Sequence, residues 1–346
     1  MMGSTDRALA LDRAKHIDQY GHDVWTSQNG LPGQAVYQIL QSPDGYLWLR
    51  TAAGLVRFDG VRFVLVEPVV AGRPVNEPVR AICIGADGDL LVRTTSRTLI
   101  YKDRVFSDYR PAGPLPDGEI RVIFESKEHD VFIGSDDFLY VFRDGTLKMV
   151  RRGTGWIDAF LQDNRELWVG GAGALYSYHG GALSTFWNLG KGSAAASLAE
   201  DHEHNLWIGT ADGLYRLAQD RRVPERVARR AIRGEVNATL EDHEGNLWVG
   251  TAATGLLRLA GSEVSSFSSP DGLSDSRVLA LYEDRESSFW VGTASGLDRF
   301  RNTKFTAITT KEKLPSDTTE SVIQTRDGSV YVFCPGGGLA GSKTMS

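Results

Sequence analysis

The sequence predicts an all-β protein, a single β-propeller built from four-stranded blades. The first observation is a motif, D-H-E-G-N-L-W-V-G-T-A-A-T-G-L at residues 242–256, whose variants recur with a period of about 40 residues. The second is that each repeat contains four short strand-like stretches separated by turn residues, which is the pattern of one propeller blade. The third is the content of 38 glycines against 12 prolines, which fits many tight turns and few rigid linkers.

The tryptophan of the motif marks eight copies of the repeat. The corresponding positions are Trp48, Leu91, Phe132, Trp168, Trp207, Trp248, Trp290 and Tyr331. We expect residues 1–19, which are polar and mixed in charge, to form a flexible leader, and residues 20–346 to form the propeller. The motif itself is interpreted as structural, with its Trp and Leu filling space between blades.

The first repeat illustrates the expected blade. Its strand candidates are 36–40, 46–51, 54–58 and 62–66, and Asp44-Gly45 and Asp59-Gly60 provide turns between them. The second candidate is apolar on both faces instead of alternating, which indicates burial on both sides. Such burial is expected where blades stack face to face.

The ends of the repeat array bear on the number of blades. A short strand candidate at 24–26 precedes the first repeat, and the eighth repeat stops after its third strand candidate. Pairing these two strands would close a ring of eight blades through the N- and C-terminal strands and would cover both edges. The alternative is seven blades with the eighth repeat outside the ring, because repeat seven has its own fourth-strand candidate at 304–308. The repeat count favours eight and leaves seven open.

Composition argues against several classes of partner. The formal net charge of −6 offers no general attraction for nucleic acid. No apolar run reaches the roughly 18 residues of a membrane helix, and the first 19 residues lack the apolar core of a secretion signal. Cys83 and Cys334 occupy unlike repeat positions, so no disulfide framework is predicted. We therefore expect no nucleic-acid partner, no membrane span and no cofactor.

Candidate ligand-binding residues lie in the loops that follow the second strands, at the expected mouth of the central channel. They are Arg50, Thr51, Arg93, Thr94, Arg97, Asp136, Asp212, Thr254 and Ser295. Arg50 and Arg93 stand where five other repeats have glycine. Two guanidinium groups on adjacent blades could together bind a carboxylate. The alternative is that each pairs with a neighbouring acid for structural reasons.

Other charged groups are interpreted as structural. His202, His204 and His243 lie near Glu203 and Glu244 in matching turns of adjacent repeats, where solvated turns are expected instead of a zinc site with four converging ligands. Six arginines between positions 221 and 233 are interpreted as a charged, exposed strand edge. The sequence has no G-x-S-x-G nucleophile motif, and no catalytic residue is predicted.

The first repeat carries a specific resemblance. The segment D-V-W-T-S-Q-N-G-L-P followed by D-G-Y-L-W-L-R-T-A-A-G-L-V-R-F-D-G-V-R-F, between Asp23 and Phe63, resembles the two-component regulator propeller family, the sensory repeats of bacterial hybrid histidine kinases and related signalling proteins. The resemblance covers residues 20–340. It implies seven-bladed propellers, a periplasmic or other extracytoplasmic location, and no catalysis within the propeller. Because the chain has no signal peptide, membrane span or kinase motif, we expect a fragment or a free-standing half of a sensor.

These observations lead to a functional hypothesis. The chain is expected to be a non-enzymatic, ligand-sensing propeller for a saccharide or an acidic small molecule, with a signalling output protein or a second copy as partner. A protein-interaction scaffold and a propeller enzyme of the glycan lyase or lactonase type are the alternatives. A mouth lined by aromatic and Arg side chains favours the first hypothesis, a flat apolar rim the second, and converging His or Asp side chains the third.

Overall fold

The computed structural model describes residues 11–13, 15–109, 119–220, 222–261, 263–303, 310, 314–316, 318–326, 329–335 and 338–343. The chain divides into two compact units, Met1–Asn302 and Thr303–Ser346. The first unit contains the propeller, and the second contains a small separate sheet.

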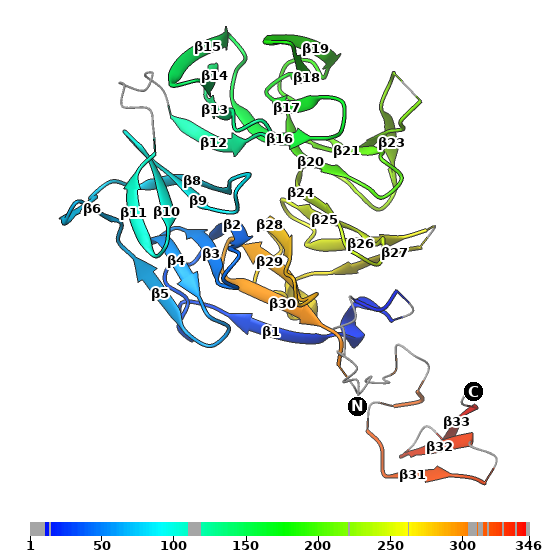
Figure 1. The fold of residues 1–346 in the computed structure, drawn as a ribbon. Helices are drawn as coiled ribbons and strands as arrows, with labels where there is room; N and C mark the ends of the chain where they lie inside the picture. Colours follow the sequence, from blue (N-terminus) through cyan, green and yellow to red (C-terminus); the bar gives the residue numbers. More distant parts are fainter. Residues whose placement is uncertain are drawn as a thin grey trace, which may run out of the picture. The chain divides into compact units, whose positions relative to one another are not determined.

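Seven four-stranded antiparallel sheets are arranged as blades around a centre, and the first strand of each blade is innermost (Figure 1). The all-β prediction is therefore confirmed. In order, the blades are: blade 1, β2 (Val36–Gln41), β3 (Leu47–Thr51), β4 (Gly54–Phe58), β5 (Phe63–Val66); blade 2, β8 (Val79–Ile84), β9 (Leu90–Thr94), β10 (Thr98–Lys102), β11 (Val105–Asp108); blade 3, β12 (Ile120–Glu125), β13 (Val131–Ser135), β14 (Phe138–Arg143), β15 (Thr146–Arg152); blade 4, β16 (Ile157–Gln162), β17 (Leu167–Gly171), β18 (Ala174–His179), β19 (Ala182–Asn188); blade 5, β20 (Ala195–Glu200), β21 (Leu206–Thr210), β22 (Gly213–Leu217), β23 (Glu225–Val227); blade 6, β24 (Val236–Glu241), β25 (Leu247–Thr251), β26 (Leu256–Ala260), β27 (Glu263–Phe267); and blade 7, β28 (Val278–Glu283), β29 (Phe289–Thr293), β30 (Leu297–Arg301) with β1 (Gly21–Trp25). The described residues of this unit also form two 3₁₀ turns, η1 (Ile17–Gln19) and η2 (Ser269–Asp271), and a hairpin of β6 (Val69–Val70) and β7 (Arg73–Pro74).

The ring is closed by the N-terminal strand. β1 pairs antiparallel with β30, from Gly21 opposite Arg301 to Trp25 opposite Leu297. The expected ring of eight blades is wrong, and the alternative of seven is confirmed. The strand predicted at 24–26 does close the ring, but its partner is repeat seven and not repeat eight. The fourth strand predicted for repeat seven at 304–308 lies outside the described residues.

Side chains explain why β1 belongs to blade 7. The Asp23 carboxylate accepts hydrogen bonds from Arg299 at 2.7 Å and from Arg301 at 3.1 Å on β30. The Trp25 ring stacks on Trp290, with 5.6 Å between ring centroids. Ion pairs and aromatic packing therefore connect the first strand of the propeller to its last blade.

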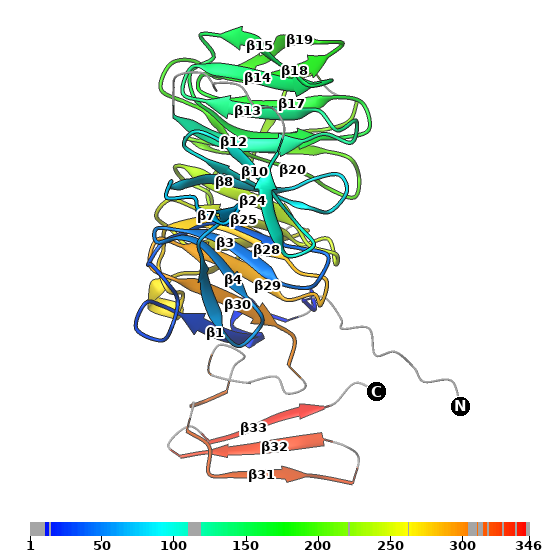
Figure 2. The ribbon, with the colours of Figure 1, turned by 60° about the vertical axis from the view of Figure 1, so that its left-hand side comes forward.

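The eighth repeat forms a three-stranded sheet in the second unit. Its strands are β31 (Ser321–Gln324), β32 (Ser329–Cys334) and β33 (Gly338–Lys343), paired in that order (Figure 2). Tyr331 and Phe333 on β32, the second strand of this repeat, are exposed, whereas second strands such as β25 in the ring are buried throughout. Burial of strands on both faces is thus a property of the stacked blades.

The recurrent motif has a structural role in the turn between the first two strands of a blade. In blade 6 the Asp242 carboxylate accepts hydrogen bonds from the Asn246 backbone N–H at 2.9 Å and from the Trp248 indole N–H at 2.7 Å. The same Asp–Trp bond occurs in blade 5, from Trp207 to Asp201. One buried carboxylate thus accepts hydrogen bonds from the turn backbone and also orients the tryptophan that packs between blades.

Part of the segment expected to be a flexible leader is described, namely 11–13 and 15–19. Leu11 and Ile17 are buried in the apolar cluster that contains Trp248. The Tyr20 hydroxyl donates a 2.8 Å hydrogen bond to the Asp12 carbonyl. These residues pack against blades 6 and 7.

Candidate functional site

The mouth of the propeller lies where the innermost strands begin and the second strands end. Each innermost strand carries a β-bulge at its second residue, which leaves one unpaired residue per blade at this end. A bulge re-aims a side chain locally and is common beside functional sites. The seven bulge residues are Tyr37, Arg80, Arg121, Asp158, Ala196, Asn237 and Leu279.

The bulge residues of blades 1 to 4 are aromatic or charged, which makes this half of the mouth the more polar one. Arg121 donates a 2.6 Å hydrogen bond to Asp158 on the next blade. Arg80 donates to Glu119 at 3.1 Å. Both arginines at the bulge position are therefore paired with acids.

Arg50, near the end of the second strand of blade 1, has no acidic partner among the described residues. Its guanidinium carbon lies 4.5 Å from the centroid of the Tyr37 ring, and its Nε donates to the Gln38 side-chain oxygen at 3.0 Å. The pKa of Arg50 is lowered to about 10, mainly by burial and with a smaller contribution from the positive charges of Arg80 and Arg121, while Tyr37 opposes the shift. Arg50 remains cationic at neutral pH, beside a Tyr37 ring that is 38% exposed.

Arg93 occupies the same repeat position but is fully buried. Its guanidinium donates to the Thr95 carbonyl at 3.0 Å and to the Thr98 hydroxyl at 3.4 Å, and burial lowers its pKa to about 10. The structure therefore does not bring Arg50 and Arg93 together at one exposed site. The alternative of a structural acid pair is not seen either, because neither arginine has an ion pair among the described residues.

The glycines at the equivalent positions show what is unusual about the first two blades. A Cβ added to Gly292 would lie 2.6 Å from the Val36 carbonyl oxygen of the next innermost strand, and one on Gly134 would lie 2.7 Å from Ile157. Close stacking of blades thus requires glycine at these junctions. At the junction of blades 1 and 2 and at the junction of blades 2 and 3, Arg50 and Arg93 stand in place of this closely packed glycine.

Four predicted site residues use their hydroxyl groups to close their own loops or to bond a neighbouring loop. Thr51 donates to the Gly54 carbonyl at 3.1 Å, and Thr94 donates to Glu77 at 2.7 Å. The Thr254 hydroxyl bonds the Thr251 hydroxyl at 2.8 Å. Ser295 donates to Asp275 at 2.6 Å. The structure gives these residues a role in shaping the mouth loops.

The remaining three predicted residues lie apart from each other. Arg97 is ion-paired with Asp108 at 3.4 Å. The Asp136 carboxylate lies 3.5 Å from Arg121, so it belongs to the polar half of the mouth. Asp212 lines a cavity of about 440 Å³ with Tyr215, away from Arg50. Burial raises the Asp212 pKa, but hydrogen bonds from Thr210 and Tyr215 outweigh it and lower the pKa overall.

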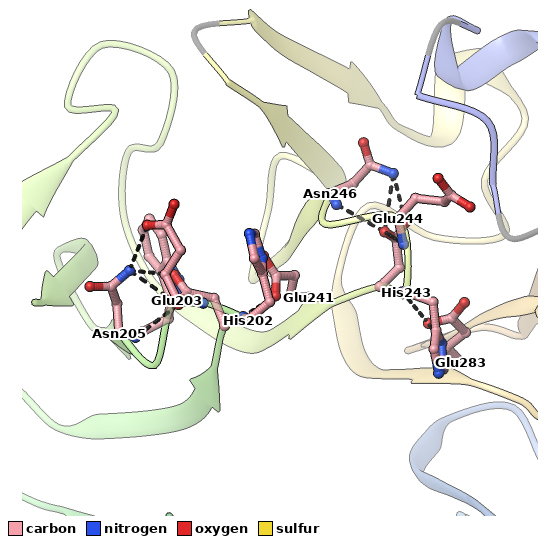
Figure 3. Close-up of polar contacts among 11 residues, drawn as sticks. His202, Glu203, Asn205, Glu241, His243, Glu244, Asn246 and Glu283 are labelled. Carbon is pink, nitrogen blue, oxygen red and sulfur yellow. Dashed lines mark hydrogen bonds and ion pairs between the residues drawn. The ribbon is translucent and has the colours of Figure 1, made fainter. Parts of the chain in front are cut away.

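His202 and His243 lie in the turns between the first and second strands of blades 5 and 6, and each is paired with a Glu that ends the next innermost strand (Figure 3). His202 Nδ1 is 2.8 Å from Glu241, and His243 Nδ1 is 2.8 Å from Glu283, in each case an acid of the following blade. Within the described part of the chain no three His, Cys, Asp or Glu side chains converge as metal ligands do. His202 and His243 instead connect neighbouring blades, and His204 bonds Glu200 of its own blade.

The His202–Glu241 pair predicts a measurable titration. The hydrogen bond to Glu241 raises the pKa of the exposed His202 above its ordinary value of 6.5. Because the folded-state pKa is the higher one, the stabilisation is complete below the unfolded value and is lost as the pH rises through the folded value. An NMR titration of the His202 ring should give a pKa above 6.5, and Glu241→Gln should lower it. An unchanged pKa in that variant would contradict the pairing.

One buried polar cluster resembles a catalytic triad in composition only. His22 Nε2 lies 2.8 Å from Asp298, and the Ser274 hydroxyl donates to the same Asp298 carboxylate. The acid stands between the other two residues, whereas a serine nucleophile requires the histidine in the middle. The cluster therefore anchors β1 to β30 and to the loop before β28.

Tyr37, Arg80, Arg121 and Asp158 are the mouth residues that sequence reasoning missed. Each is the second residue of its first strand, at the same repeat position. The predicted candidates all lie at the ends of second strands or in the loops after them, whereas these four residues lie at the start of first strands. A comparison of that position across repeats would have shown that its polar and aromatic residues gather in repeats one to four.

The comparisons with known proteins agree with this architecture. Residues 30–53, 232–253 and 272–295 match the family model for the two component regulator propeller. No curated protein matches the chain significantly. The helices among the described residues are all too short or too polar to cross a membrane.

Several solved structures share the fold. The extracellular domain of the hybrid two component system BT3049 from B. thetaiotaomicron aligns with a TM-score of 0.73 and 17% identity, over 94% of this chain and 48% of that one. The corresponding domain of BT4673 aligns with a TM-score of 0.68 and 18% identity, over 91% of this chain and 44% of that one. Virginiamycin B lyase from Staphylococcus aureus aligns with a TM-score of 0.64 and 13% identity, over 82% of this chain and 100% of that one. At such identities the likeness shows the fold alone, and the chain spans less than half of the two extracellular domains.

The sequence matches and the structural matches therefore point in the same direction. The chain is a seven-bladed β-propeller in which three segments match the two component regulator propeller model, and its fold is similar to that of extracellular domains of hybrid two-component systems.

Proposed function

We propose that this propeller is a non-enzymatic sensor module that binds a carboxylate-bearing saccharide at its mouth, outside the cytoplasm. The location is supported by its likeness to extracellular domains of two-component systems. Binding would be transmitted to a signalling partner or to a second copy of the chain.

The observation that carries this proposal is Arg50. A guanidinium without an acidic partner, held by stacking on Tyr37, is suited to a bidentate contact with a ligand carboxylate. The exposed part of the Tyr37 ring and the ring of Trp156, which is 44% exposed, offer apolar faces for a sugar. Trp156 lies at the mouth because its carbonyl accepts a hydrogen bond from Ala172, which follows the second strand of blade 4.

The mouth supports binding better than catalysis. Its arginines at positions 80 and 121 are held by acids, and these ion pairs leave no free carboxylate pair positioned for acid–base chemistry among the described mouth residues. The lyase likeness concerns the fold. An interaction scaffold would be expected to have a flat apolar rim. The bulge residues of blades 1 to 4 are largely charged, so this end of the propeller does not favour that role.

A thermal-shift screen of the full chain against neutral monosaccharides, uronic acids and uronic-acid disaccharides tests the proposal. A ligand present at 100 times its Kd stabilises the folded state by about 2.7 kcal/mol. We expect an increase in Tm with uronic-acid ligands and none with the neutral sugars. An absence of any saccharide-dependent shift, together with tight binding of a protein to the same face, would favour the scaffold instead.

A further inference from the structure

The turns at the end opposite the mouth connect neighbouring blades by a recurring hydrogen bond. The backbone N–H of the second turn residue donates to the side chain that ends the next innermost strand. This bond is present at five of the seven junctions, from Ala86 to Glu125, Lys127 to Gln162, His202 to Glu241, His243 to Glu283 and Arg285 to Gln41. We call it the inter-blade clasp.

The junction of blades 1 and 2 lacks the clasp on both sides and is closed by packing. Pro43 has no N–H to donate, and Ile84 has no side-chain acceptor. Pro43 instead packs on Gly88, where an added Cβ would lie 2.7 Å from the proline ring. Loss of the donor is therefore matched by loss of the acceptor.

The junction of blades 4 and 5 lacks the clasp on one side only. Its turn spans residues 163–166 between β16 and β17, one residue shorter than the turn 201–205 of blade 5. Glu200 still provides the acceptor, but the shortened turn provides no donor to it. The Glu200 carboxylate instead accepts a 2.6 Å bond from His204 of its own blade and stays partly exposed.

A groove of about 400 Å³ is found at this junction. Trp168, Phe186, Leu206 and Leu217 line it together with Glu166 and Glu200. The Glu166 Oε2 atom is buried and has no hydrogen-bond partner among the described residues. A buried carboxylate oxygen without a partner is costly, so a cation that enters the groove would be stabilised there.

A second groove, of about 460 Å³, lies on the other side of the same short turn. The two grooves share Asp163, Asn164, Arg165 and Glu166, and the second one is also lined by Lys127, Glu128 and the ion pair of Asp130 with Arg143. An extended chain that crosses the turn would therefore contact both grooves. The charge of the first groove is mainly negative, with Asp163, Glu166 and Glu200 against Arg165.

We propose that these two grooves bind an extended basic peptide, with one arginine side chain in the first groove between Glu166 and Glu200. Arginine fits this groove because its planar guanidinium can bond to carboxylates while it stacks on an aromatic ring such as the partly buried Phe186. The site lies at the end opposite the mouth and is independent of the saccharide proposal.

Fluorescence anisotropy of the full chain with a labelled Arg-Gly-Arg-Gly-Arg peptide tests this site. The control is the same peptide with citrulline in place of each arginine, because citrulline has a similar shape and no charge. We expect binding of the arginine peptide, none of the citrulline peptide, and at least a tenfold loss of affinity in Glu166→Gln/Glu200→Gln. Glu244→Gln, an exposed acid in the turn of blade 6, is the control and should change the affinity less than twofold.

Several outcomes would overturn the proposal. Equal losses in the double variant and in Glu244→Gln would indicate general attraction to an acidic surface. Binding of free spermidine as tightly as the peptide would indicate a site for small amines. No binding of the arginine peptide at 50 mM salt would remove the site. Near-UV circular dichroism of each variant checks that the ring is intact.

Discussion

Replacement of Trp248 by alanine is expected to lower the free energy of unfolding by about 3–5 kcal/mol, the range for a fully buried tryptophan. Trp248 has no exposed surface, and its ring stacks on Phe289 with 4.4 Å between centroids. Its indole N–H donates a hydrogen bond to the buried Asp242 carboxylate, and the variant would lose this hydrogen bond. The loss therefore combines a cavity between blades with a weakened turn.

Urea unfolding monitored by far-UV circular dichroism measures this effect. Trp156→Ala is the control, because that side chain is 44% exposed and buries less apolar surface. A loss for Trp248→Ala no larger than that for Trp156→Ala would contradict the role given to the repeated tryptophan.

The second large effect concerns closure of the ring. Removal of residues 1–25 deletes β1 and leaves β30 as a free edge with an unsatisfied row of backbone groups. It also uncovers Trp290 and leaves Arg299 without Asp23. The shortened chain is expected to lose more than about 4 kcal/mol, above the range of ordinary point changes, and to associate through the free edge.

The matched control is removal of residues 303–346, the unit that contains repeat eight. A ring of seven blades does not use this repeat, so the Tm of the propeller should change by less than about 2 °C, the effect of a fraction of a kcal/mol. Differential scanning calorimetry with light scattering measures both variants. If the two deletions destabilised the chain equally, repeat eight would belong to the ring.

Much of the fold could be predicted because its signals are local. They are the repeat period, the turn dipeptides and the second strands that are apolar on both faces. The number of blades could not be predicted, since it depends on whether the strand ending at Trp25 pairs with repeat seven or repeat eight. Asp23, Arg299 and Arg301 decide that choice, and their proximity exists only in the folded ring. A pattern within one repeat carries no information about such a long-range pairing.

The candidate site was predicted only in part for a related reason. Arg50 and Arg93 look equivalent in the alignment of repeats, yet Arg93 is buried in its blade while Arg50 stacks on Tyr37. The difference depends on local partners, Thr98 in one blade and Gln38 in the other. A departure from the repeat pattern thus drew attention to both positions, and only the structure separated a fully buried arginine from a partly buried one without an acidic partner.

Isothermal titration calorimetry with D-glucuronate tests the proposed role of the mouth most directly. Arg57 is the matched control for Arg50, since its guanidinium also lies 4.5 Å from a tyrosine ring, Tyr46, but on the third strand of blade 1. The wild-type chain and Arg57→Gln should bind with similar affinity, whereas Arg50→Gln should bind at least tenfold more weakly because a charge-assisted hydrogen bond contributes about 1.5–3 kcal/mol. Binding of glucuronate by Arg50→Gln with wild-type affinity would contradict the assignment of the mouth as an anion-binding site.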